Sequence, residues 1–532
     1  MKTPRRDRTE VRGRIPVWAG IALVLGLACQ GSSSNGLPEV RTDGRFDEWR
    51  EAPVTVDDPG DASPGSPVDF GALRLLDDPQ YVHLALDVGA TVNAQSMPGT
   101  ISLPFDADGD PATGGTLGDM DGVDLILELS RRDRPRPGGY GAGVGIRWVD
   151  SAGPGPVESA YPADVVVAPT FAAPRFEIRL HRGPVPGHRS IFTGTTLRVR
   201  AVVEGSSGGS DRTDIATYRF RTSRASTRAR NEGVPVDLRR AAGAFRVVQW
   251  NVSDESFREN PELYNRILAV LEPDVILLDE VYGTVTADDL ATFFRTAPLG
   301  LLGDWRFVLG FSGGRQRGVV ATRGGAIRPE STLLDVHYPP GAVDRLEVEL
   351  SPGSDFGATL ELERERGLPT AGAWLDPDGK GADILFVPLD FQSGGYDGSP
   401  EDRLRELQAQ TLADRLSRVV AVRGPVPIVV AGDLNLVGSR RPLDLLRAAG
   451  LAVAEGYDLW NRTQTTWRNP ASAFTPGRLD FALYVPRFLR VARAFPFEPL
   501  GLGPDPVRTL GVEARALQTS DHVPVVTDLV RR

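Results

Sequence analysis

The sequence predicts two folded regions of different class, an antiparallel β-sandwich followed by an α/β domain. The chain has 532 residues, 41% of them hydrophobic and 24% charged, which is the balance of a globular protein too long for one core. Short β-rich runs separated by Gly, Pro, Asp and Ser fill residues 37–221, and no long amphipathic helix interrupts them. From residue 244 onward, β-rich runs alternate with amphipathic helices, which favours an α/β arrangement.

The charge and cysteine content narrow the function classes. The formal net charge is −10, so the chain as a whole lacks the basic footprint of a protein that binds nucleic acid mainly through phosphate contacts. A nucleic-acid partner is therefore disfavoured but not excluded. Cys29 is the only cysteine, so no disulfide partner is expected within the chain.

The N-terminal segment predicts export. Residues 1–14 carry six basic side chains, and residues 15–28 form an apolar run of 14 residues, shorter than the roughly 20 that a spanning helix needs. Cys29 follows at once, and a Gly- and Ser-rich stretch comes next. The pattern resembles a bacterial lipoprotein signal, which implies a signal over residues 1–28, lipidation at Cys29, a tether over residues 29–36 and a membrane-anchored protein of the cell envelope. A cleaved signal with secretion, or an uncleaved anchor, is the alternative.

Strands of the first region are expected at residues 80–88, 123–129 and 197–204. Its opening, VRTDGRFDEWREAP at residues 40–53, resembles the start of carbohydrate-binding-module family 9-like sandwiches, as does FDADGDPATGG at residues 105–115 with the later Gly-Val-Asp at 122–124. The resemblance implies a sandwich over residues 37–221 with carbohydrate as a candidate ligand. Sandwiches of this kind also serve as spacers or docking modules, so the fold does not settle the ligand.

An acidic loop in this region is a candidate calcium site. Asp106, Asp108, Asp110 and Asp124 lie in a Gly-rich stretch, and calcium prefers six to eight oxygen ligands. An EF-hand is excluded, because Pro111 and Leu117 occupy the positions of its glycine and its bidentate glutamate. The alternative is an acidic turn whose Asp side chains bond to their own backbone.

Residues 222–243 are polar and Arg-rich with no apolar period, which predicts an interdomain linker; a basic patch for an anionic partner is the alternative. In the second region, residues 244–532, Asn260-Pro261 and Ser399-Pro400 mark two helix starts. We also expect the segment at residues 337–380, rich in Gly, Pro and charge, to shape a cleft.

Polar side chains end or adjoin nearly every predicted strand of the second region. They are Asn251, Asp279, Glu280, Asp390, Asp433, Asn435, Asp480, Asp521 and His522. For any one of these residues, a strand that ends at a solvated turn is a sufficient explanation. A set of carboxylates at adjacent strand ends would repel one another and resist burial unless a cation lay between them. The pattern therefore predicts a divalent metal site.

Six short motifs in a fixed order carry a stronger resemblance. They are Trp250-Asn251, PDVILLDEV with Glu280, QRGVVATR at residues 316–323, GDLN at 432–435, GRLDF with Asp480, and SDHVPV at 520–525. The set resembles the endonuclease/exonuclease/phosphatase superfamily. The resemblance implies an α/β (α+β) four-layer sandwich, two mixed β-sheets packed face to face with helices outside.

The resemblance also implies the roles of the site residues. Glu280 matches the principal magnesium (or manganese) carboxylate, with Asn251 and Asp521 in the same metal environment. Asp433 and Asn435 match the pair that orients the attacking water and binds phosphate oxygens. His522 matches the catalytic histidine, and Asp480 matches the carboxylate that fixes its tautomer and stabilises its charged form.

Asp390 departs from the family pattern, because VPLDFQSGG at residues 387–395 has Asp where many members have a second histidine. Asp390 could act as the acid if its neighbours raise its pKa, could bind a second metal, or could mark a weakened enzyme. Asp279 replaces the Gln that usually precedes the metal Glu, which we expect to add one more carboxylate to the site.

These observations together predict an exported, lipid-anchored, magnesium-dependent phosphoester hydrolase. Nucleic acid, a phospholipid headgroup and an inositol phosphate all stay open as substrates. The alternative function is a surface binding protein, in which the sandwich binds a glycan or another partner and the second domain is a catalytically decayed hydrolase.

Overall fold

The computed structural model describes Val40–Arg532 except residues 137–138, 186, 189, 224–236, 351–355, 461, 500–510 and 512–518. The expected signal, the tether and Cys29 lie outside the described residues, as does most of the expected linker. Val40–Arg532 form one compact unit. Within the described part of the chain, none of the helices combines the length and the apolar character needed to cross a membrane.

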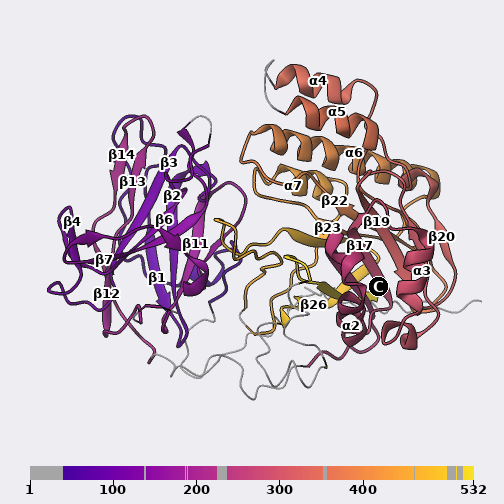
Figure 1. Ribbon diagram of the computed structural model, residues 1–532, viewed down its shortest axis with the longest axis horizontal. Helices are drawn as coiled ribbons and strands as arrows, with labels where there is room; N and C mark the ends of the chain where they lie inside the picture. Colours follow the sequence, from indigo (N-terminus) through magenta and orange to yellow (C-terminus); the bar gives the residue numbers. More distant parts are fainter. Residues whose placement is uncertain are drawn as a thin grey trace, which may run out of the picture. The chain divides into compact units, whose positions relative to one another are not determined.

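The first region is an antiparallel β-sandwich (Figure 1). One sheet has the order β1 (Leu73–Asp77), β2 (Tyr81–Val92), β11 (Ala173–His181) and β10 (Val166–Ala168). The other has the order β14 (Ser210–Arg212), β13 (Val202–Gly205), β3 (Gly99–Asp106), β6 (Leu125–Leu129), β7 (Val144–Asp150) and β8 (Gly153–Pro154), with β9 (Glu158–Ser159), β12 (Thr196–Val199) and β15 (Ala216–Arg219) paired beside it. A separate hairpin joins β4 (Gly115–Leu117) and β5 (Met120–Val123).

Alternating side chains of the two sheets form a shared core, because successive strand residues point to opposite faces. Leu75, Leu84 and Ile178 of one sheet pack with Leu103 and Leu127 of the other, and all five are buried. The antiparallel sandwich is thus confirmed. The strand expected at residues 197–204 is divided: β12 pairs with β15, whereas β13 pairs with β14.

The second region contains two six-stranded mixed sheets. The first has the order β18 (Arg306–Leu309), β19 (Gln316–Thr322), β17 (Val275–Tyr282), β16 (Phe245–Asp254), β27 (Val525–Arg531) and β26 (Leu489–Pro496). The second has the order β20 (Ile327–Pro329), β21 (Ala373–Leu375), β22 (Ile384–Asp390), β23 (Ile428–Asp433), β25 (Asp480–Tyr484) and β24 (Ala452–Val453). The pairs β16–β17 and β22–β23 are parallel, and the other pairs within these sheets are antiparallel.

Seven α-helices are described in this region: α1 (Glu255–Glu259), α2 (Pro261–Leu271), α3 (Ala287–Arg295), α4 (Ala342–Glu349), α5 (Gly357–Arg366), α6 (Pro400–Arg423) and α7 (Arg441–Ala448). Short 3-10 turns are η1 (Glu48–Arg50) and η3 (Tyr161–Ala163) in the first region, and η4 (Leu299–Leu302) and η5 (Ser331–Leu333) in the second.

Three apolar layers separate four layers of structure. Val247 and Leu277 of the first sheet pack with Phe386 and Val429 of the second, so the sheets lie face to face. The outer face of the first sheet packs against α2 and α3, and that of the second against α6 and α7. The predicted four-layer sandwich is confirmed.

Both predicted helix starts exist. The Ser399 hydroxyl accepts a hydrogen bond from the Asp402 backbone N–H and caps α6. The Asn260 side chain does not cap α2, and its Nδ2 is turned back to the Ser256 carbonyl at 3.5 Å. The segment at residues 337–380 supplies α4, α5 and β21, and its helices pack on Leu404 of α6. The described residues of this segment therefore add to the outer helical layer, and none of them lines the active-site cavity described below.

Candidate active site

Three carboxylates meet where strands of both sheets end. One oxygen each of Glu280, Asp390 and Asp433 lies within 4.8 Å of the others. Asp390 and Asp433 face each other in register at the ends of the parallel strands β22 and β23, and Glu280 comes from β17 of the other sheet. Carboxylate oxygens at this spacing are a donor set that suits a hard divalent cation such as magnesium.

Irregular backbone aims Glu280 into this group. The pairing of β17 with β19 shifts between Leu278 and Val281, and Glu280 has a φ of 54°. Bulges of this kind redirect side chains next to active sites. The Asn251 amide donates to Glu280 Oε1 at 2.9 Å and holds the carboxylate in place.

Asp279 lies beside the group of three carboxylates but is not one of them. Its Oδ1 accepts a hydrogen bond from Gln249 Nε2 at 2.9 Å, and the same amide nitrogen lies 3.0 Å from Asp480 Oδ1. Asp279 is buried, and its charge is one of those that raise the pKa of Asp390. The expectation that Asp279 adds one more carboxylate to the site stays a prediction, because Asp279 is not one of the three carboxylates within 4.8 Å of one another.

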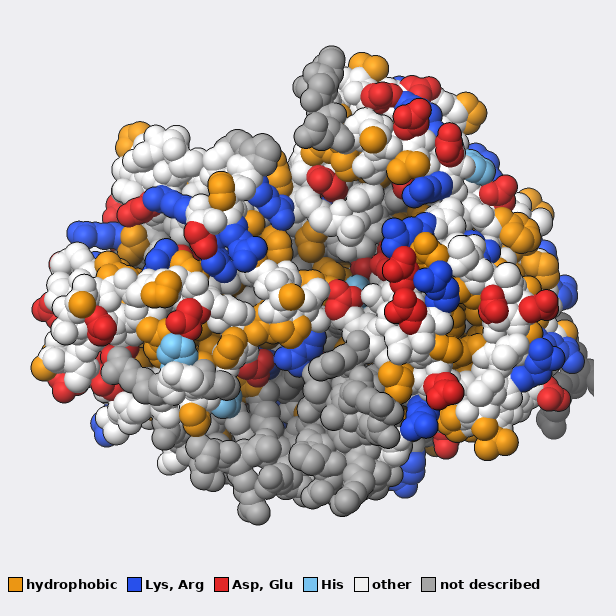
Figure 2. All heavy atoms as spheres, viewed as in Figure 1, with side chains coloured by type: hydrophobic (Ala, Val, Ile, Leu, Met, Phe, Trp, Pro, Cys, Tyr) orange, Lys and Arg blue, Asp and Glu red, His pale blue; other side chains and the backbone are white. Residues whose placement is uncertain are grey.

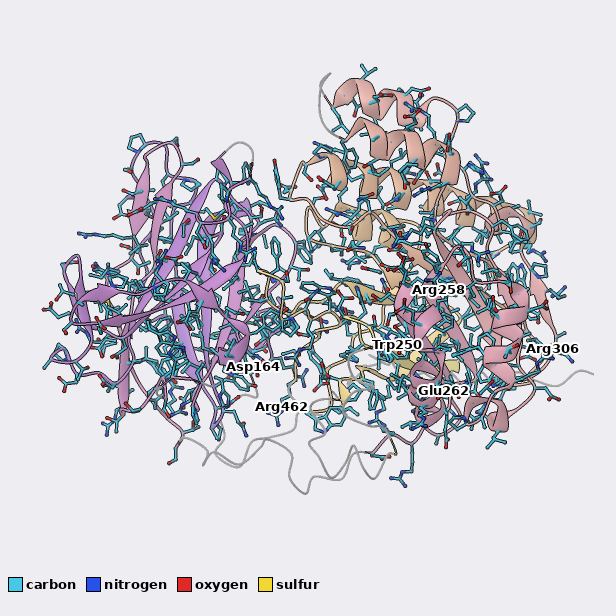
Figure 3. All side chains as sticks on the ribbon, in the orientation of Figure 1. Asp164, Trp250, Arg258, Glu262, Arg306 and Arg462 are labelled. Atoms are coloured by element: carbon cyan, nitrogen blue, oxygen red, sulfur yellow. The ribbon has the colours of Figure 1, made fainter. Side chains whose placement is uncertain are left out.

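A histidine–aspartate pair lies next to the carboxylates. His522 Nδ1 is 2.7 Å from Asp480 Oδ2, and His522 Nε2 is 3.6 Å from Asp433 Oδ2. The backbone of His522 is fixed on both sides, because its N–H donates to Ser520 Oγ and its carbonyl accepts from the Trp250 indole at 2.9 Å. Trp250, labelled in Figure 3, lies on β16.

The electrostatics of the metal-free site follow from crowded, buried charge. Burial, together with the charge of Asp480, raises the pKa of Asp433 to about 8, although His522 acts in the opposite direction. Burial, followed by the charges of Glu280 and Asp433, raises the pKa of Asp390 well above its usual value. Burial lowers the pKa of His522, but the charges of Asp480 and Asp433 outweigh it, so the net shift is well upward. The imidazole is thus held in its charged form beside carboxyls that resist ionisation.

Asn435 is built into the same corner. Its backbone N–H donates to Asp433 Oδ1 at 2.7 Å, and its Nδ2 donates to Asp433 Oδ2 at 2.8 Å and to the Phe391 carbonyl at 2.9 Å. Its φ is 49°, in the left-handed region that non-glycine residues rarely adopt. Gly432 allows the close approach of β22, since a Cβ there would lie 1.8 Å from the Leu389 carbonyl oxygen.

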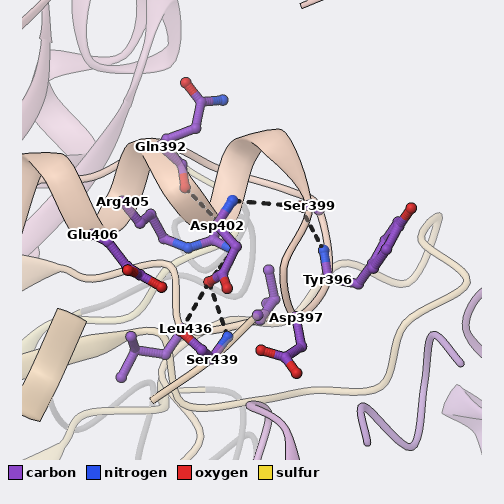
Figure 4. Close-up of polar contacts among 12 residues, drawn as sticks. Gln392, Tyr396, Asp397, Ser399, Asp402, Arg405, Glu406, Leu436 and Ser439 are labelled. Atoms are coloured by element: carbon purple, nitrogen blue, oxygen red, sulfur yellow. Dashed lines mark hydrogen bonds and ion pairs between the residues drawn. The ribbon is translucent and has the colours of Figure 1, made fainter. Parts of the chain in front are cut away.

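A buried ion pair fixes the loops that follow β22 and β23 (Figure 4). Arg405 and Asp402 of α6 are both fully buried. Arg405 Nη1 donates to the Gln392 and Gly394 carbonyls at 2.7 Å each. Asp402 accepts from the Ser439 N–H at 2.9 Å, so one pair of side chains holds both loops.

Asp521 lies at the site but outside the group of three carboxylates. Its Oδ2 accepts from the Trp467 indole at 3.0 Å.

Trp467 and Asp254 were not predicted from the sequence, since no motif marks them. Asp254 is paired with Arg315 at 3.0 Å; burial and the nearby charge of Glu280 raise the pKa of Asp254 to about 6.

A cavity of about 340 Å³ opens onto Glu280, Asp433, Asn435, Asp521 and His522. A larger cavity of about 870 Å³ is lined by residues that include Arg440 and Phe481 but none of these five. We assign the site to the smaller cavity because the carboxylates and the histidine lie there.

The acidic loop of the sandwich brings together three of its four predicted residues. Oxygens of Asp106, Asp108 and Asp124 lie within 4.8 Å of one another, whereas Asp110 is outside this group and accepts from the Ala112 N–H at 3.0 Å. Asp106 and Asp124 also accept backbone N–H bonds, at 2.7 and 2.9 Å, as the acidic-turn alternative expects. Calcium binding by this loop stays a prediction. Asp61, Asp69 and Asp211 form another acidic group that the sequence did not indicate.

Two face-to-face mixed sheets with a carboxylate-rich edge place the second region in the α/β-sandwich class. The model of the Endonuclease/Exonuclease/phosphatase family matches residues 248–522, more than half of the chain, and the chain belongs to this family. No curated protein matches the chain.

Solved structures to which this chain is similar include proteins of several activities. The human Nocturnin catalytic domain with bound sulfate is 15% identical, covers 55% of this chain and 96% of its own, and has a TM-score of 0.37. A mannosyl-6-phosphatase from Bacteroides thetaiotaomicron is 17% identical, with 54% and 99% covered and a TM-score of 0.36. A 3′ phosphatase from Neisseria bound to a product DNA hairpin is 18% identical, with 53% and 98% covered and a TM-score of 0.33.

Proposed function

We propose that the protein is an exported phosphoester hydrolase that depends on a divalent cation, magnesium or manganese. The observation that carries this proposal is the convergence of Glu280, Asp390 and Asp433 within 4.8 Å, beside a histidine that is hydrogen-bonded to a buried carboxylate. The family match supports a hydrolase and leaves the substrate open.

Oxygen donors from Glu280, Asp390 and Asp433 would hold the cation, with Asn251 orienting Glu280 through its amide. When bound, the cation supplies a Lewis acid that neutralises charge on a phosphoryl oxygen. The donor set fits this role because all three side chains are carboxylates. The pKa values of Asp390 and Asp433 are raised in the metal-free protein, and a cation between these groups would favour their ionised forms.

His522 and its neighbours supply the rest of the chemistry. Asp480 holds Nδ1 of the imidazole, which leaves Nε2 directed to the cavity side near Asp433. The charged imidazole stabilises negative charge that develops on the transferred phosphoryl group. Asn435 fixes both carboxyl oxygens of Asp433, which places that group to orient a water molecule.

Export and attachment complete the proposal. The basic N-terminus, the short apolar run and the following Cys29 support a lipoprotein that is anchored at the cell envelope. Mass spectrometry of the protein purified from membranes tests this directly. A mature N-terminus at Cys29 carrying acyl chains is expected, and an unmodified N-terminus elsewhere would refute lipidation.

Duplex DNA is disfavoured as the main substrate by the net charge of −10. On the right-hand part of the face in Figure 2, arginine and lysine side chains are interspersed with acidic ones. A small phosphoester, in contrast, contacts only the active site and needs no extended basic surface.

The activity is tested on a generic phosphodiester and a phosphomonoester, with magnesium, with manganese and with EDTA. Glu280→Ala and His522→Ala should each remove the metal-dependent turnover. Glu262→Ala on α2, an exposed glutamate labelled in Figure 3, is the matched control and should retain it. Turnover that survives EDTA or either site substitution would refute the assigned site. A protein that folds but shows no turnover would instead favour the decayed-hydrolase alternative.

A further inference from the structure

The cavity at the carboxylates is lined by both regions of the chain. The second region contributes the reacting groups, including Glu280, Asp433 and His522. The sandwich contributes Asn93, Gln95, Ser96 and Arg136 to the same cavity. All of these residues belong to the one compact unit, Val40–Arg532.

Asn93 fastens the sandwich to the loops that carry the site. Its Nδ2 donates to the Val437 carbonyl at 3.0 Å and lies 3.2 Å from the Gly438 carbonyl, while its Oδ1 accepts from the Asp397 N–H at 2.7 Å. The side chain is 5% exposed. One buried amide therefore satisfies backbone groups on the loops after β22 and β23, the strands that end in Asp390 and Asp433.

Further contacts hold the same wall. Gln95 Oε1 accepts from the Thr475 N–H at 2.9 Å, and the Val144 N–H donates to the Ala473 carbonyl at 2.8 Å. Tyr140 stacks on Tyr396 with ring centroids 4.3 Å apart. These hydrogen bonds and the stacked tyrosines hold the sandwich residues in place as one wall of the cavity.

Arg136 is the charged group of this wall. Among the described residues that line the cavity it is the only arginine or lysine. It is half-buried, its guanidinium lies 5.2 Å from the centre of the Phe474 ring, and its Nη1 makes two long hydrogen bonds, to the Gly395 carbonyl at 3.3 Å and to Ser96 Oγ at 3.5 Å. A guanidinium offers five N–H donors in a fixed fork that suits phosphate and carboxylate groups.

We propose that the sandwich forms a substrate-selecting wall of the active site and that Arg136 binds a second anionic group of a small phosphorylated substrate. This inference rests on the proposed function and adds the substrate class to it. A volume of about 340 Å³ is in the range of small-molecule sites, roughly 300 to 1,000 Å³. The reacting phosphoryl group would lie beside His522 and the carboxylates that would hold the cation, and Arg136 would supply the positive charge for a second anion on the same molecule.

The test compares kcat/KM for glucose 1,6-bisphosphate, p-nitrophenyl phosphate and a 20-nucleotide single-stranded DNA, all with magnesium. In Arg136→Ala the ratio of kcat/KM for the bisphosphate to that for p-nitrophenyl phosphate should fall about tenfold, mostly through KM for the bisphosphate. Arg136→Lys should retain part of the ratio. Arg132→Ala is the matched control, since exposed Arg132 pairs with Glu204 outside the cavity, and it should keep the wild-type ratio.

Each outcome has a distinct meaning. An active wild-type protein whose ratio is unchanged by Arg136→Ala, or which prefers p-nitrophenyl phosphate or the oligonucleotide to the bisphosphate, overturns this inference and leaves the proposed function standing. A wild-type protein that turns over none of the three probes with magnesium or manganese overturns the proposed function, and this inference with it. Melting temperatures of the variants show whether a loss reflects unfolding.

Discussion

Asp390→Asn tests whether the three carboxylates form a metal site. Two unit charges 4.8 Å apart repel by about 3.5 kcal/mol at an effective dielectric constant of about 20, and Asp390 lies within this distance of Glu280 and Asp433. The pKa of Asp390 is raised in the folded protein, so its contribution to stability is full only below the unfolded-state pKa of about 4 and is lost as the pH rises from there through the folded-state pKa. The isosteric amide removes this loss.

In EDTA, the free energy of unfolding of Asp390→Asn should therefore match that of wild type near pH 4, where an unfolded-state Asp begins to ionise. Its excess over wild type should grow from there to about 1 to 3 kcal/mol at pH 9. With magnesium the order reverses, because the amide is a poorer ligand, and the magnesium affinity should fall about 10- to 100-fold. Urea unfolding at both pH values, with and without magnesium, measures both effects. Asp414→Asn on the exposed face of α6 is the control. Equal stability in EDTA at pH 9, or an unchanged response to magnesium, would show that Asp390 is outside the metal site.

Three further outcomes are expected. Magnesium affinity should rise up to about tenfold per pH unit between pH 6 and 8, because Asp433, with a pKa of about 8, must lose its proton to bind the ion. Calorimetry in two buffers should detect the released proton, and a pH-independent affinity would contradict this expectation. Asp480→Asn should lower the pKa of His522, so the alkaline loss of activity moves to lower pH in the pH–rate profile; an unmoved profile would count against His522 acting in its charged form. Arg405→Ala should lower the free energy of unfolding by about 3 to 5 kcal/mol by leaving Asp402 buried without its partner, whereas Arg403→Ala, on the exposed side of α6, should change it by less than about 1 kcal/mol.

The fold was predictable from the sequence where the signal is local. Apolar runs, Ser399-Pro400 and the change from β-rich runs to alternating strands and helices are all read within short windows, and each corresponds to an element of the structure. The division of residues 197–204 into β12 and β13 was not predictable, because it depends on which strands pair with each half. The failure of the Asn260 cap has a similar origin, since α1 lies directly before it and its Ser256 carbonyl takes the amide.

The site was predictable in its parts and not in its arrangement. Polar residues at strand ends indicated that Glu280, Asp390 and Asp433 belong to one edge, because the ends of parallel strands meet there. The sequence did not show that the irregular pairing of β17 and the positive φ of Glu280 direct this side chain toward Asp390 and Asp433. The cavity wall from the sandwich was also missed, because Asn93 and Val437 are 344 positions apart and share no motif.

The strained backbone at the active site indicates a structural role for the sandwich residues that line the cavity. Asp254, Glu280 and Asn435 have φ values of 53°, 54° and 49°, and such conformations cost of order 1 to 3 kcal/mol each and persist only where the surroundings over-determine them. The Asn251 amide restrains Glu280, and the Asp433 carboxyl restrains Asn435. The loops next to Asn435 and Asp390 are restrained in addition by Asn93, which belongs to the sandwich. The sandwich thus contributes to the geometry of the carboxylate group as well as to the cavity, so a substitution at Asn93 should weaken magnesium binding even though Asn93 is outside the ligand set.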